Sequence, residues 1–372
     1  MDRPRSSSWA WPLWAATGAG VRSTRMRLGL KADNLLERVA DWFNLAPQPV
    51  AHAFFGMMAS RTLMAGVRLG VYEALTDGPM SAETLAARLK LSEEGTRTLL
   101  EALIACEAVE RQRGGRYRLA PRARRWLDPR SPRYVGAFLE FNYAQWDWWT
   151  GLEGVVRTGQ AVDIHGFAPD DARWRDYIHA MHQMARLAAP EVVAAIPLPR
   201  GAKQVLDLGG AHGWFAAELC LRNRGLKATV LDLEGSARVG REIIASAGLS
   251  HLVTHREGDI LTAELGGPYD GVMLFQVMHH LTPAQNVALL RRVRASLAPR
   301  GTLAVLEYLR ENADTPTSAA PLIGLHYFLT SGAAAYTPAE VEGFLDDAGF
   351  RIENSRPIRH LPLQTLLVAR LD

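Results

Sequence analysis

The chain has 372 residues and a formal net charge of +3, with 48% apolar and 22% charged residues. This length allows two domains, and this composition excludes a disordered or collagen-like chain. No run of about 18 uncharged apolar residues occurs, which excludes a membrane-spanning helix, and Cys106 and Cys220 are too few for a disulfide framework, so we expect a reduced, soluble, cytoplasmic protein.

The first 30 residues combine a charged start with a short apolar stretch that is rich in tryptophan. This combination loosely resembles a signal peptide, but Pro12 interrupts the apolar stretch. We therefore expect residues 1–30 to form a flexible tail, with secretion as the alternative.

Two helical patterns follow the tail. Apolar residues fall at helical spacing over residues 32–45, and a second pattern runs from Pro49 to about Leu75. The second pattern is apolar over most of its circumference, which is typical of a core helix or of an interface. Near the start of a chain, an interface between subunits is a plausible use.

The next pattern is helix, turn, helix and hairpin. Ser81 is placed to cap a short helix, and a second helix is predicted over residues 93–108. Strands at residues 109–111 and 117–119 flank Gly114 and predict a hairpin. This order is that of a winged helix.

A winged helix can bind nucleic acid or support dimerisation. Residues 1–130 carry 20 Lys and Arg against 13 Asp and Glu, and the hairpin supplies Arg111, Arg113, Arg116 and Arg118. The second helix, however, presents Glu93, Glu94 and Glu101, which phosphates would repel. We therefore favour a dimerisation domain over residues 31–132.

Residues 133–200 are expected to form a helical linker that contributes to a substrate pocket. Large aromatic side chains are concentrated there: Phe138, Phe141, Tyr143, Trp146, Trp148, Trp149, Trp174 and Tyr177. Such residues can form ordinary core or can line a pocket for a flat organic molecule, and both interpretations stay open.

From residue 201 to the end, strand and helix patterns alternate. Strands are predicted at residues 204–208, 228–233, 252–256, 271–275 and 302–307, and helices at 214–224, 236–247 and 283–297. This alternation predicts an α/β domain with a doubly wound parallel sheet. Ligands bind such sheets beyond the carboxyl ends of the strands.

The first of these strands ends in a glycine-rich turn. The dinucleotide fingerprint would need glycines at positions 209, 211 and 214, where the chain has Gly209, Ala211 and Trp214. The pattern of S-adenosylmethionine (SAM) binders needs Asp207, Gly209, a small residue at 211 and Gly213, and it fits except for the extra methyl group of Ala211.

Acidic residues follow the next two strands. Asp232 is placed to accept both hydroxyls of a ribose, and Asp259 can accept the exocyclic amine of adenine. One such acid alone is more often a helix cap or a solvated turn. Acids at three successive strand ends, together with the glycine turn, predict a nucleoside cofactor, which we identify as SAM.

With these motifs in place, residues 35–372 resemble the SAM-dependent small-molecule O-methyltransferases of the caffeic acid O-methyltransferase type, including bacterial relatives from secondary metabolism. The motifs that carry the resemblance are the winged-helix module and residues 205–213, 230–233, 258–259, 276–281, 336–341 and 347–350. The resemblance implies a Rossmann-like class I methyltransferase domain with a mostly parallel seven-stranded sheet over residues 201–372, preceded by the α-helical winged-helix dimerisation domain.

The resemblance also implies the activity. We expect methyl transfer from SAM to a hydroxyl of a hydrophobic, aromatic or polycyclic small molecule, in a homodimer that interlocks through the N-terminal domain and binds no nucleic acid. One alternative is an N- or C-methyltransferase, or a relative that binds SAM without methyl transfer. A second, less favoured alternative is a SAM-responsive winged-helix transcription regulator.

Within this frame the resemblance places a general base at His279, oriented by Glu307. It also places Met181 against the acceptor, and we assign Trp146 and His280 to the same pocket. The residues assigned to the cofactor are Asp207, Gly209, Gly210, Gly213, Asp232, Leu233, Asp259, Ile260 and Gln276.

The chain departs from the family pattern at two positions. Many members have an acid after the base, where this chain has His280, and a second orienting glutamate belongs near Ala335. Two alternatives therefore stay open: His280 is the base, or both histidines only shape the turn and line the pocket. We predict no metal site, because His251 and His255 lie on a predicted strand and do not converge on one ion.

Overall fold

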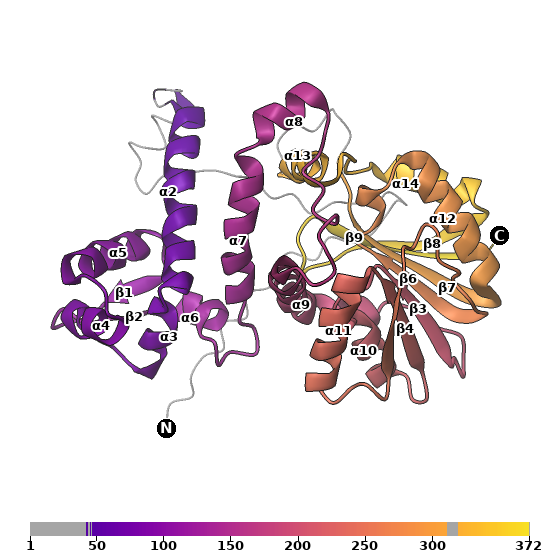
Figure 1. The fold of residues 1–372 in the computed structure, drawn as a ribbon, viewed down its shortest axis with the longest axis horizontal. Coiled ribbons are helices and arrows are strands. Elements are labelled where there is room, and N and C mark those ends of the chain that lie inside the picture. The colour runs from indigo at the N-terminus through magenta and orange to yellow at the C-terminus, as the bar shows by residue number, and fades with distance from the viewer. Residues whose placement is uncertain (1–41, 44, 46, 311–318, 372) are drawn as a thin grey trace.

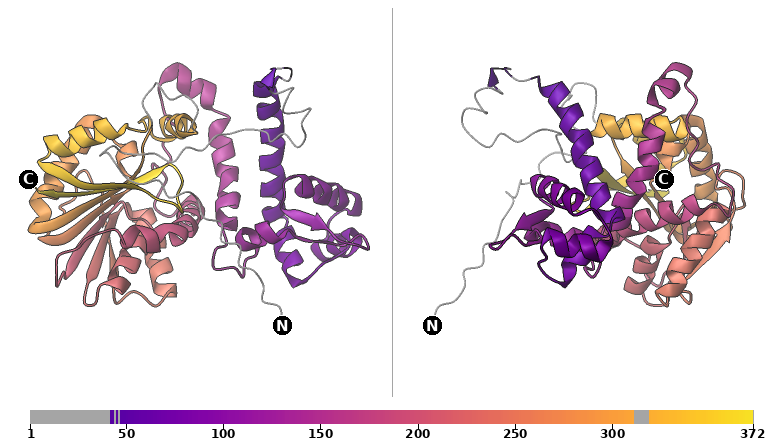
Figure 2. Two further views of the ribbon diagram at one scale, coloured as in Figure 1. Left: turned by 180° about the vertical axis from the view of Figure 1, so that it is seen from behind. Right: turned by 60° about the vertical axis from the view of Figure 1, so that its left-hand side comes forward.

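The computed structural model describes residues 42–43, 45, 47–310 and 319–371. The expected tail and most of the helix expected over residues 32–45 lie outside these residues. The described chain forms an N-terminal module and a sheet domain, which are joined through a helical segment (Figures 1 and 2).

The N-terminal module has the predicted order of helices and hairpin. Its elements are α2 (Gln48–Arg68), α3 (Val71–Ala74), α4 (Ala82–Leu89), α5 (Glu93–Ala105), β1 (Val109–Arg111), β2 (Tyr117–Leu119) and α6 (Pro121–Leu127). The Ser81 hydroxyl accepts a hydrogen bond from the N–H of Thr84 at 3.2 Å, which caps α4 as predicted. An apolar cluster from α3, α4, α5 and the hairpin forms the core of the module.

Two helices of this module end earlier than the sequence pattern predicts. The stretch expected to continue to Leu75 breaks at Gly70, which has φ of 72°. The helix expected to reach Ala108 ends at Ala105, because Glu107 takes a positive φ of 56° and the chain turns into β1. Hydrophobic spacing does not register such single left-handed residues, so these predicted boundaries are wrong by three to seven residues.

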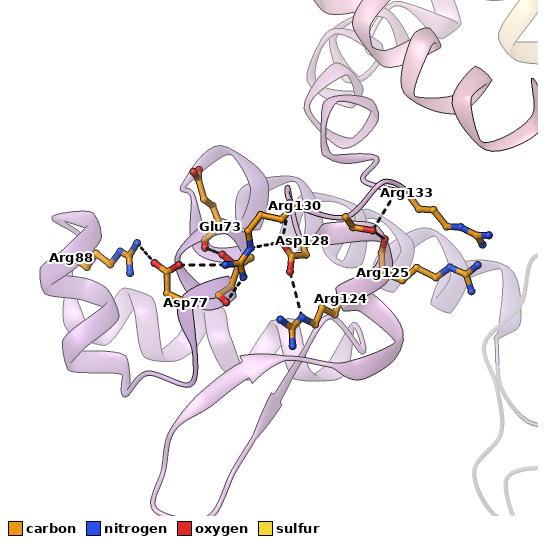
Figure 3. Close-up of polar contacts among 10 residues, drawn as sticks. Glu73, Asp77, Arg88, Arg124, Arg125, Asp128, Arg130 and Arg133 are labelled. Atoms are coloured by element: carbon orange, nitrogen blue, oxygen red, sulfur yellow. Dashed lines mark hydrogen bonds and ion pairs between the residues drawn. The ribbon is translucent and has the colours of Figure 1, made fainter. Parts of the chain in front are cut away.

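A chain of ion pairs links α4, the segment after α3 and the segment after α6 (Figure 3). Asp77 contacts Arg88 at 2.6 Å and Arg130 at 3.8 Å. Arg130 also contacts Asp128 at 3.2 Å, and Asp128 contacts Arg124 at 3.4 Å. Asp128 is buried while the three arginines are exposed. Two carboxylates thus partly neutralise three of the arginines that make this region basic.

The hairpin arginines have similar partners. Arg118 contacts Glu110 at 2.5 Å on the neighbouring part of the hairpin, and Arg111 lies 3.7 Å from Glu101 of α5. These two guanidinium groups are therefore already engaged by carboxylates of the same module. Arg113 and Arg116, at the tip of the hairpin, form no ion pair with any residue that the structure describes.

Three helices connect the module to the sheet domain: α7 (Gly136–Trp149), α8 (Leu152–Thr158) and α9 (Ala172–Val193). Helix α7 stands between α2 and the sheet domain and packs against both α2 and α9 (Figure 1). The segment predicted as a helical linker is therefore helical, and it forms the wall between the two parts of the molecule.

The sheet domain contains one seven-stranded sheet in the order β5-β4-β3-β6-β7-β9-β8. Its strands are β3 (Gln204–Leu208), β4 (Lys227–Asp232), β5 (Val253–Glu257), β6 (Tyr269–Phe275), β7 (Leu297–Tyr308), β8 (Phe350–Pro357) and β9 (Gln364–Leu371). Strands β3 to β7 are parallel, and β9 is antiparallel to both its neighbours. The mostly parallel seven-stranded sheet is confirmed, and its order reverses between β3 and β6, where ligands bind in such folds.

Helices cover both faces of this sheet. The helices after the strands are α10 (Trp214–Arg222), α11 (Glu234–Ser246), the short 3-10 turn η2 (Met278–His280), α12 (Pro283–Ser296), α13 (Ala320–Ser331) and α14 (Pro338–Asp347). Buried side chains of α9, α10 and α11 pack on one face, and those of α12 and α14 pack on the other. Among the described helices, none is both long and apolar enough to cross a membrane.

Candidate active site

The turn after β3 is held in an unusual backbone conformation. Gly209 and Gly213 both have φ of 66°, and a Cβ atom at Gly209 would lie 2.6 Å from Val277 Cγ2. Ala211 also has a positive φ, of 44°, which glycine adopts freely and which the methyl group of alanine makes less favourable. Its N–H donates to Asp232 Oδ2 at 2.8 Å, and its carbonyl lies 2.9 Å from His255 Nε2.

Asp207 is a buried carboxyl group at the end of β3. Its Oδ1 has no hydrogen-bond partner among the described residues. Burial, and secondly the neighbouring Asp232, raise the pKa of Asp207 to about 8. A Cβ atom at Gly210 would lie 2.3 Å from the Asp207 carboxyl carbon, so a larger residue there would close the space beside this carboxyl. A buried acceptor without a partner suits a ligand that brings a donor or a positive charge.

Asp232 lies at the end of β4 and faces the same turn. Its two carboxylate oxygens accept hydrogen bonds from Ala211 N at 2.8 Å and Leu233 N at 2.7 Å. Burial raises the pKa of Asp232 to about 6 even though these hydrogen bonds act to lower it. Each carboxylate oxygen keeps a second lone pair, so the group can still accept from a hydroxyl.

The residues assigned at β5 and β6 lie at the same edge of the sheet. Asp259 is exposed after β5, and its Oδ1 accepts from Leu261 N at 2.8 Å, while Ile260 is half-buried beside it. Gln276 follows β6 with φ of 57°, and its side-chain amide donates to Leu306 O and Gln364 Oε1, each at 3.2 Å. The assigned cofactor residues therefore follow strands β3, β4, β5 and β6.

His279 and Glu307 form a buried pair. His279 is 3% exposed on η2 and Glu307 is 0% exposed on β7, yet their Nδ1 and Oε1 atoms lie 2.6 Å apart. Because the carboxylate accepts from Nδ1–H, the remaining ring nitrogen of a neutral His279 is an acceptor. The backbone N–H of Tyr308 also donates to Glu307 Oε1 at 2.9 Å, which helps to fix the carboxylate.

The ring of His279 packs against two other rings. Tyr327 of α13 stacks on it with centroids 3.6 Å apart and planes 10° apart, and the ring of His280 lies at 4.1 Å, tilted by 55°. The Tyr327 hydroxyl is 3.4 Å from Gln276 Oε1, so it also touches the assigned cofactor side. His280 is fixed separately through its Nδ1, 2.5 Å from Ser331 Oγ.

The residues assigned to the acceptor do not all come together. Met181 is half-buried on α9. Trp146 lies on the side of α7 that faces α2, where it lines a cavity of about 510 Å³ together with Ser60, Asn142, Gln145, Trp149 and Thr150. Among the described residues, no ring contact joins Trp146 to His279 or His280. Ala335, where the family pattern has a second glutamate, is buried and offers His279 no carboxylate.

The sequence patterns did not reveal several residues around His279. His165, in the segment between α8 and α9, lies 4.5 Å from the His280 ring centroid, and His326 of α13 stacks on Trp149 at 6.2 Å. Tyr177 of α9 packs against His165 at 6.0 Å. The aromatic concentration over residues 133–200 indicated Tyr177 and Trp149, but no motif marks His165, His326 or Tyr327.

Histidines near the glycine turn have structural partners. His212 Nδ1 accepts from the N–H of Trp214 at 3.0 Å, which shapes the turn as predicted. His255 contacts Ala211 O from β5, whereas His251 is exposed and lies 3.0 Å from Gly248 O. In the described part of the chain, no group of three or more His, Cys, Asp or Glu side chains is arranged to hold a metal ion.

Two protein-family models match this chain. An O-methyltransferase domain model matches residues 158–351, and an O-methyltransferase dimerisation domain model matches residues 51–129. The chain is 31% identical over 307 residues to the tetracenomycin polyketide synthesis 8-O-methyl transferase TcmO of Streptomyces glaucescens, covering 80% of this chain and 88% of that protein.

One further sequence relative and one solved structure are also similar to this chain. The N,N-dimethyltransferase OxyT of Streptomyces rimosus is 28% identical over 319 residues, which cover 83% of this chain and 92% of OxyT. The crystal structure of human N-acetylserotonin methyltransferase in complex with SAM superposes with a TM-score of 0.76 at 21% identity, covering 91% of this chain and 99% of that one.

Proposed function

The chain belongs to the O-methyltransferase family and is a SAM-dependent O-methyltransferase, and from that premise we propose that His279 is the base that takes the proton of the acceptor hydroxyl. The observation that carries this proposal is the buried contact of 2.6 Å between His279 Nδ1 and Glu307 Oε1. This contact leaves Nε2 of His279 free to accept a proton, and the carboxylate stabilises the imidazolium that results.

The residues at the strand tips fit the cofactor. When bound, SAM supplies a methyl group that its sulfonium already activates. The unpartnered Asp207 Oδ1 suits the positive charge of this ligand, and Asp232 keeps lone pairs for the ribose hydroxyls. The positive-φ turn from Gly209 to Gly213 brings the backbone close to the ligand. Gly210, Leu233, Asp259, Ile260 and Gln276 complete the proposed site.

We further propose that the acceptor is a flat aromatic or polycyclic molecule. Tyr327 stacks on His279, Tyr177 packs against His165, and the ring of Trp148 lies 6.5 Å from that of His326. These rings offer flat apolar surfaces, and Met181 and His280 are assigned to the same pocket. Trp146 faces the cavity against α2, so its proposed contact with the acceptor would have to come from that side of α7. The relative TcmO, which is named for polyketide synthesis, supports an acceptor of this class.

The proposed oligomer is a homodimer formed through the N-terminal module. The first half of α2 exposes a row of large apolar side chains: Val50, Phe54, Phe55, Met57 and Met58. Phe54 and Phe55 are 52% and 53% exposed, and they lie within the matched dimerisation domain. A second copy of the chain would bury this face. Sedimentation of the full chain at micromolar concentration tests this proposal, and a monomer there would contradict it.

Nitrogen methylation is the second candidate, because OxyT is similar over most of both chains. The buried His279–Glu307 pair favours oxygen, since a hydroxyl needs its proton removed whereas a neutral amine attacks without a base. The transcription-regulator alternative has less support. Hairpin arginines Arg111 and Arg118 are engaged by carboxylates of the same module.

The test of the function uses the full chain, SAM labelled in the methyl group, and a panel of phenols and aromatic amines. We expect label on oxygen, and His279→Ala should lower kcat at least about a hundredfold while SAM affinity stays within about twofold. His251→Ala is the matched control, because His251 is exposed and lies outside the proposed site. Label on nitrogen or carbon, or a loss below about fivefold for His279→Ala, would contradict the proposal.

A further inference from the structure

Three more histidines lie near the His279–Glu307 pair, and the proposed proton transfer uses none of them. His280 lies 4.1 Å from His279, and His165 meets His280 nearly edge to face, at 4.5 Å and 85°. His326 is one residue before Tyr327, the ring that stacks on His279, and its own ring lies 6.0 Å from that of Tyr327. These rings come from η2, from the segment between α8 and α9, and from α13.

The hydrogen bonds of His326 determine which of its nitrogens carries a proton. The indole Nε1–H of Trp149 donates to His326 Nδ1 at 3.3 Å. An indole N–H can only donate, so Nδ1 must be the acceptor, and the proton of the neutral ring sits on Nε2. Within the described chain, this Nε2–H has no acceptor.

His279 is arranged in the opposite way. Its Nδ1–H is held by Glu307, so its Nε2 accepts. The site therefore presents one nitrogen that accepts, on His279, and one N–H that donates, on His326, and both rings contact Tyr327. A hydroxyl of the acceptor can donate to His279, and a carbonyl oxygen, which has no proton, can accept from the N–H of His326.

The rings beside His279 carry no charge at neutral pH. Burial lowers the pKa of His326 and of His165 to about 4, and burial together with neighbouring histidines lowers that of His280 well below its usual range. Neutral imidazoles do not repel the sulfonium of SAM. They hydrogen-bond uncharged oxygens, whereas a carboxylate at position 280 would repel a carbonyl oxygen.

We propose that His326 forms a second oxygen-binding subsite, so that the acceptor is an aromatic ring system that bears a carbonyl oxygen in addition to the methylated hydroxyl. In this subsite the Nε2–H of His326 donates to the carbonyl, and Trp149 keeps the proton on that nitrogen. This inference rests on the proposed function, because it assumes that the acceptor hydroxyl meets His279.

The subsite makes a prediction about selectivity. An acceptor without a carbonyl would cover the Nε2–H of His326 and leave it unsatisfied, which disfavours binding. We therefore compare a hydroxyanthraquinone with the hydroxyanthracene that carries its hydroxyl at the same ring position. The two probes have the same three rings and differ in the carbonyl oxygens. Dissociation constants are measured by fluorescence titration of the full chain with the demethylated cofactor present.

We expect the wild-type enzyme to bind the hydroxyanthraquinone at least about tenfold more tightly than the hydroxyanthracene. His326→Leu should lower this ratio at least about fivefold, and His326→Gln should restore most of it, because an amide can accept from Trp149 and still donate. Trp149→Phe should also lower the ratio, since the proton of His326 is then no longer held on Nε2. His251→Leu, on the exposed surface, is the matched control and should leave the ratio unchanged.

Equal binding of the two probes by the wild-type enzyme overturns the subsite, and so does a ratio that His326→Leu leaves unchanged. Methyl transfer from labelled SAM is followed separately. Transfer to both probes without selectivity refutes the subsite and leaves the proposed function intact. Selective binding without any transfer to oxygen refutes the proposed function, while the carbonyl-binding role of His326 stands.

Discussion

The two sides of the site are built in different ways. On the cofactor side, the residues follow consecutive strands, and their positions depend on backbone geometry, as at Gly209 and Gly213. On the acceptor side, rings from α7, α9 and α13 pack against His326, His165 and His279, and their positions depend on which side chains pack together. The cofactor side carries the buried carboxyl groups of Asp207 and Asp232, and the acceptor side carries His165, His280 and His326, whose pKa values burial lowers.

This difference separates the binding of the cofactor, which the fold itself supports, from the binding of the acceptor, which depends on the rings of this chain. A cationic nucleoside needs carboxylates and close backbone approach, and the strand tips of a parallel sheet supply both. A flat acceptor needs only surfaces and a few placed donors, which many combinations of rings can supply. We therefore expect substitutions at the strand tips to have large effects on affinity or rate, and substitutions of the rings to alter selectivity more than rate.

The largest effect is expected on kcat, from a change to Glu307, which orients the proposed base between the cofactor side and the acceptor side. Glu307→Gln should lower kcat at least about a hundredfold, because the amide can present its N–H to His279 Nδ1 and so favour the wrong tautomer. Single-turnover methyl transfer measures this loss, and SAM affinity should stay within about twofold. Glu342→Gln, at an exposed position of α14, is the matched control. A loss below about fivefold would show that Glu307 does not orient the base.

The second largest effect is expected on SAM affinity. Asp232→Asn should weaken SAM binding at least about tenfold, because a neutral amide replaces the carboxylate that we propose accepts the ribose hydroxyls. The raised pKa of Asp232, about 6, sets the sign of the pH dependence. As the pH falls through 6, the carboxylate of the wild-type protein takes up a proton, so SAM affinity should decrease.

Calorimetric titrations with SAM from pH 5 to pH 8 check this second effect. The variant should lose the decrease near pH 6, while any dependence due to Asp207, whose pKa is about 8, persists with a shifted midpoint. Unchanged SAM affinity in Asp232→Asn would remove Asp232 from the cofactor site.

The smallest effect is expected from the acceptor side. Tyr327→Leu should lower kcat about threefold to tenfold, since it removes the ring that stacks on His279 at 3.6 Å and keeps an apolar side chain. Tyr327→Phe keeps the stacked ring and loses only the hydroxyl near Gln276, so it should stay within about twofold of the wild-type rate. A hundredfold loss in Tyr327→Leu would instead place this ring in the chemistry, and the contrast between the two sides would fail.

The cofactor side was largely predictable from the sequence. The range predicted for the first strand, residues 204–208, is the range that β3 has, and the turn from Asp207 to Gly213 carries its signal in adjacent residues. The pairing of His279 with Glu307 came from the family resemblance. The contact of 2.6 Å agrees with it, although 28 residues separate the two in the chain.

The acceptor side was not predictable in the same way. His165 and His280 meet across 115 residues, and Trp149 and His326 across 177, so no local pattern joins them. Trp146 illustrates the limit. The aromatic concentration around it was visible, but the rotation of α7 places it against α2 and gives the contact with His326 to Trp149. Which face of an apolar helix meets which neighbour depends on packing over the whole molecule.

Trp149 belongs to two environments at once, because it lines the cavity against α2 and its indole N–H holds His326. Because Ser60 of α2 lines the same cavity, a change in the N-terminal module could alter the hydrogen bond between Trp149 and His326. Substrate choice would then change although the module does not contact the substrate. An occupant of that cavity that drew the indole N–H toward itself would release Nδ1 of His326 and let the ring change tautomer. The same enzyme would then offer its acceptor a lone pair where it had offered a proton.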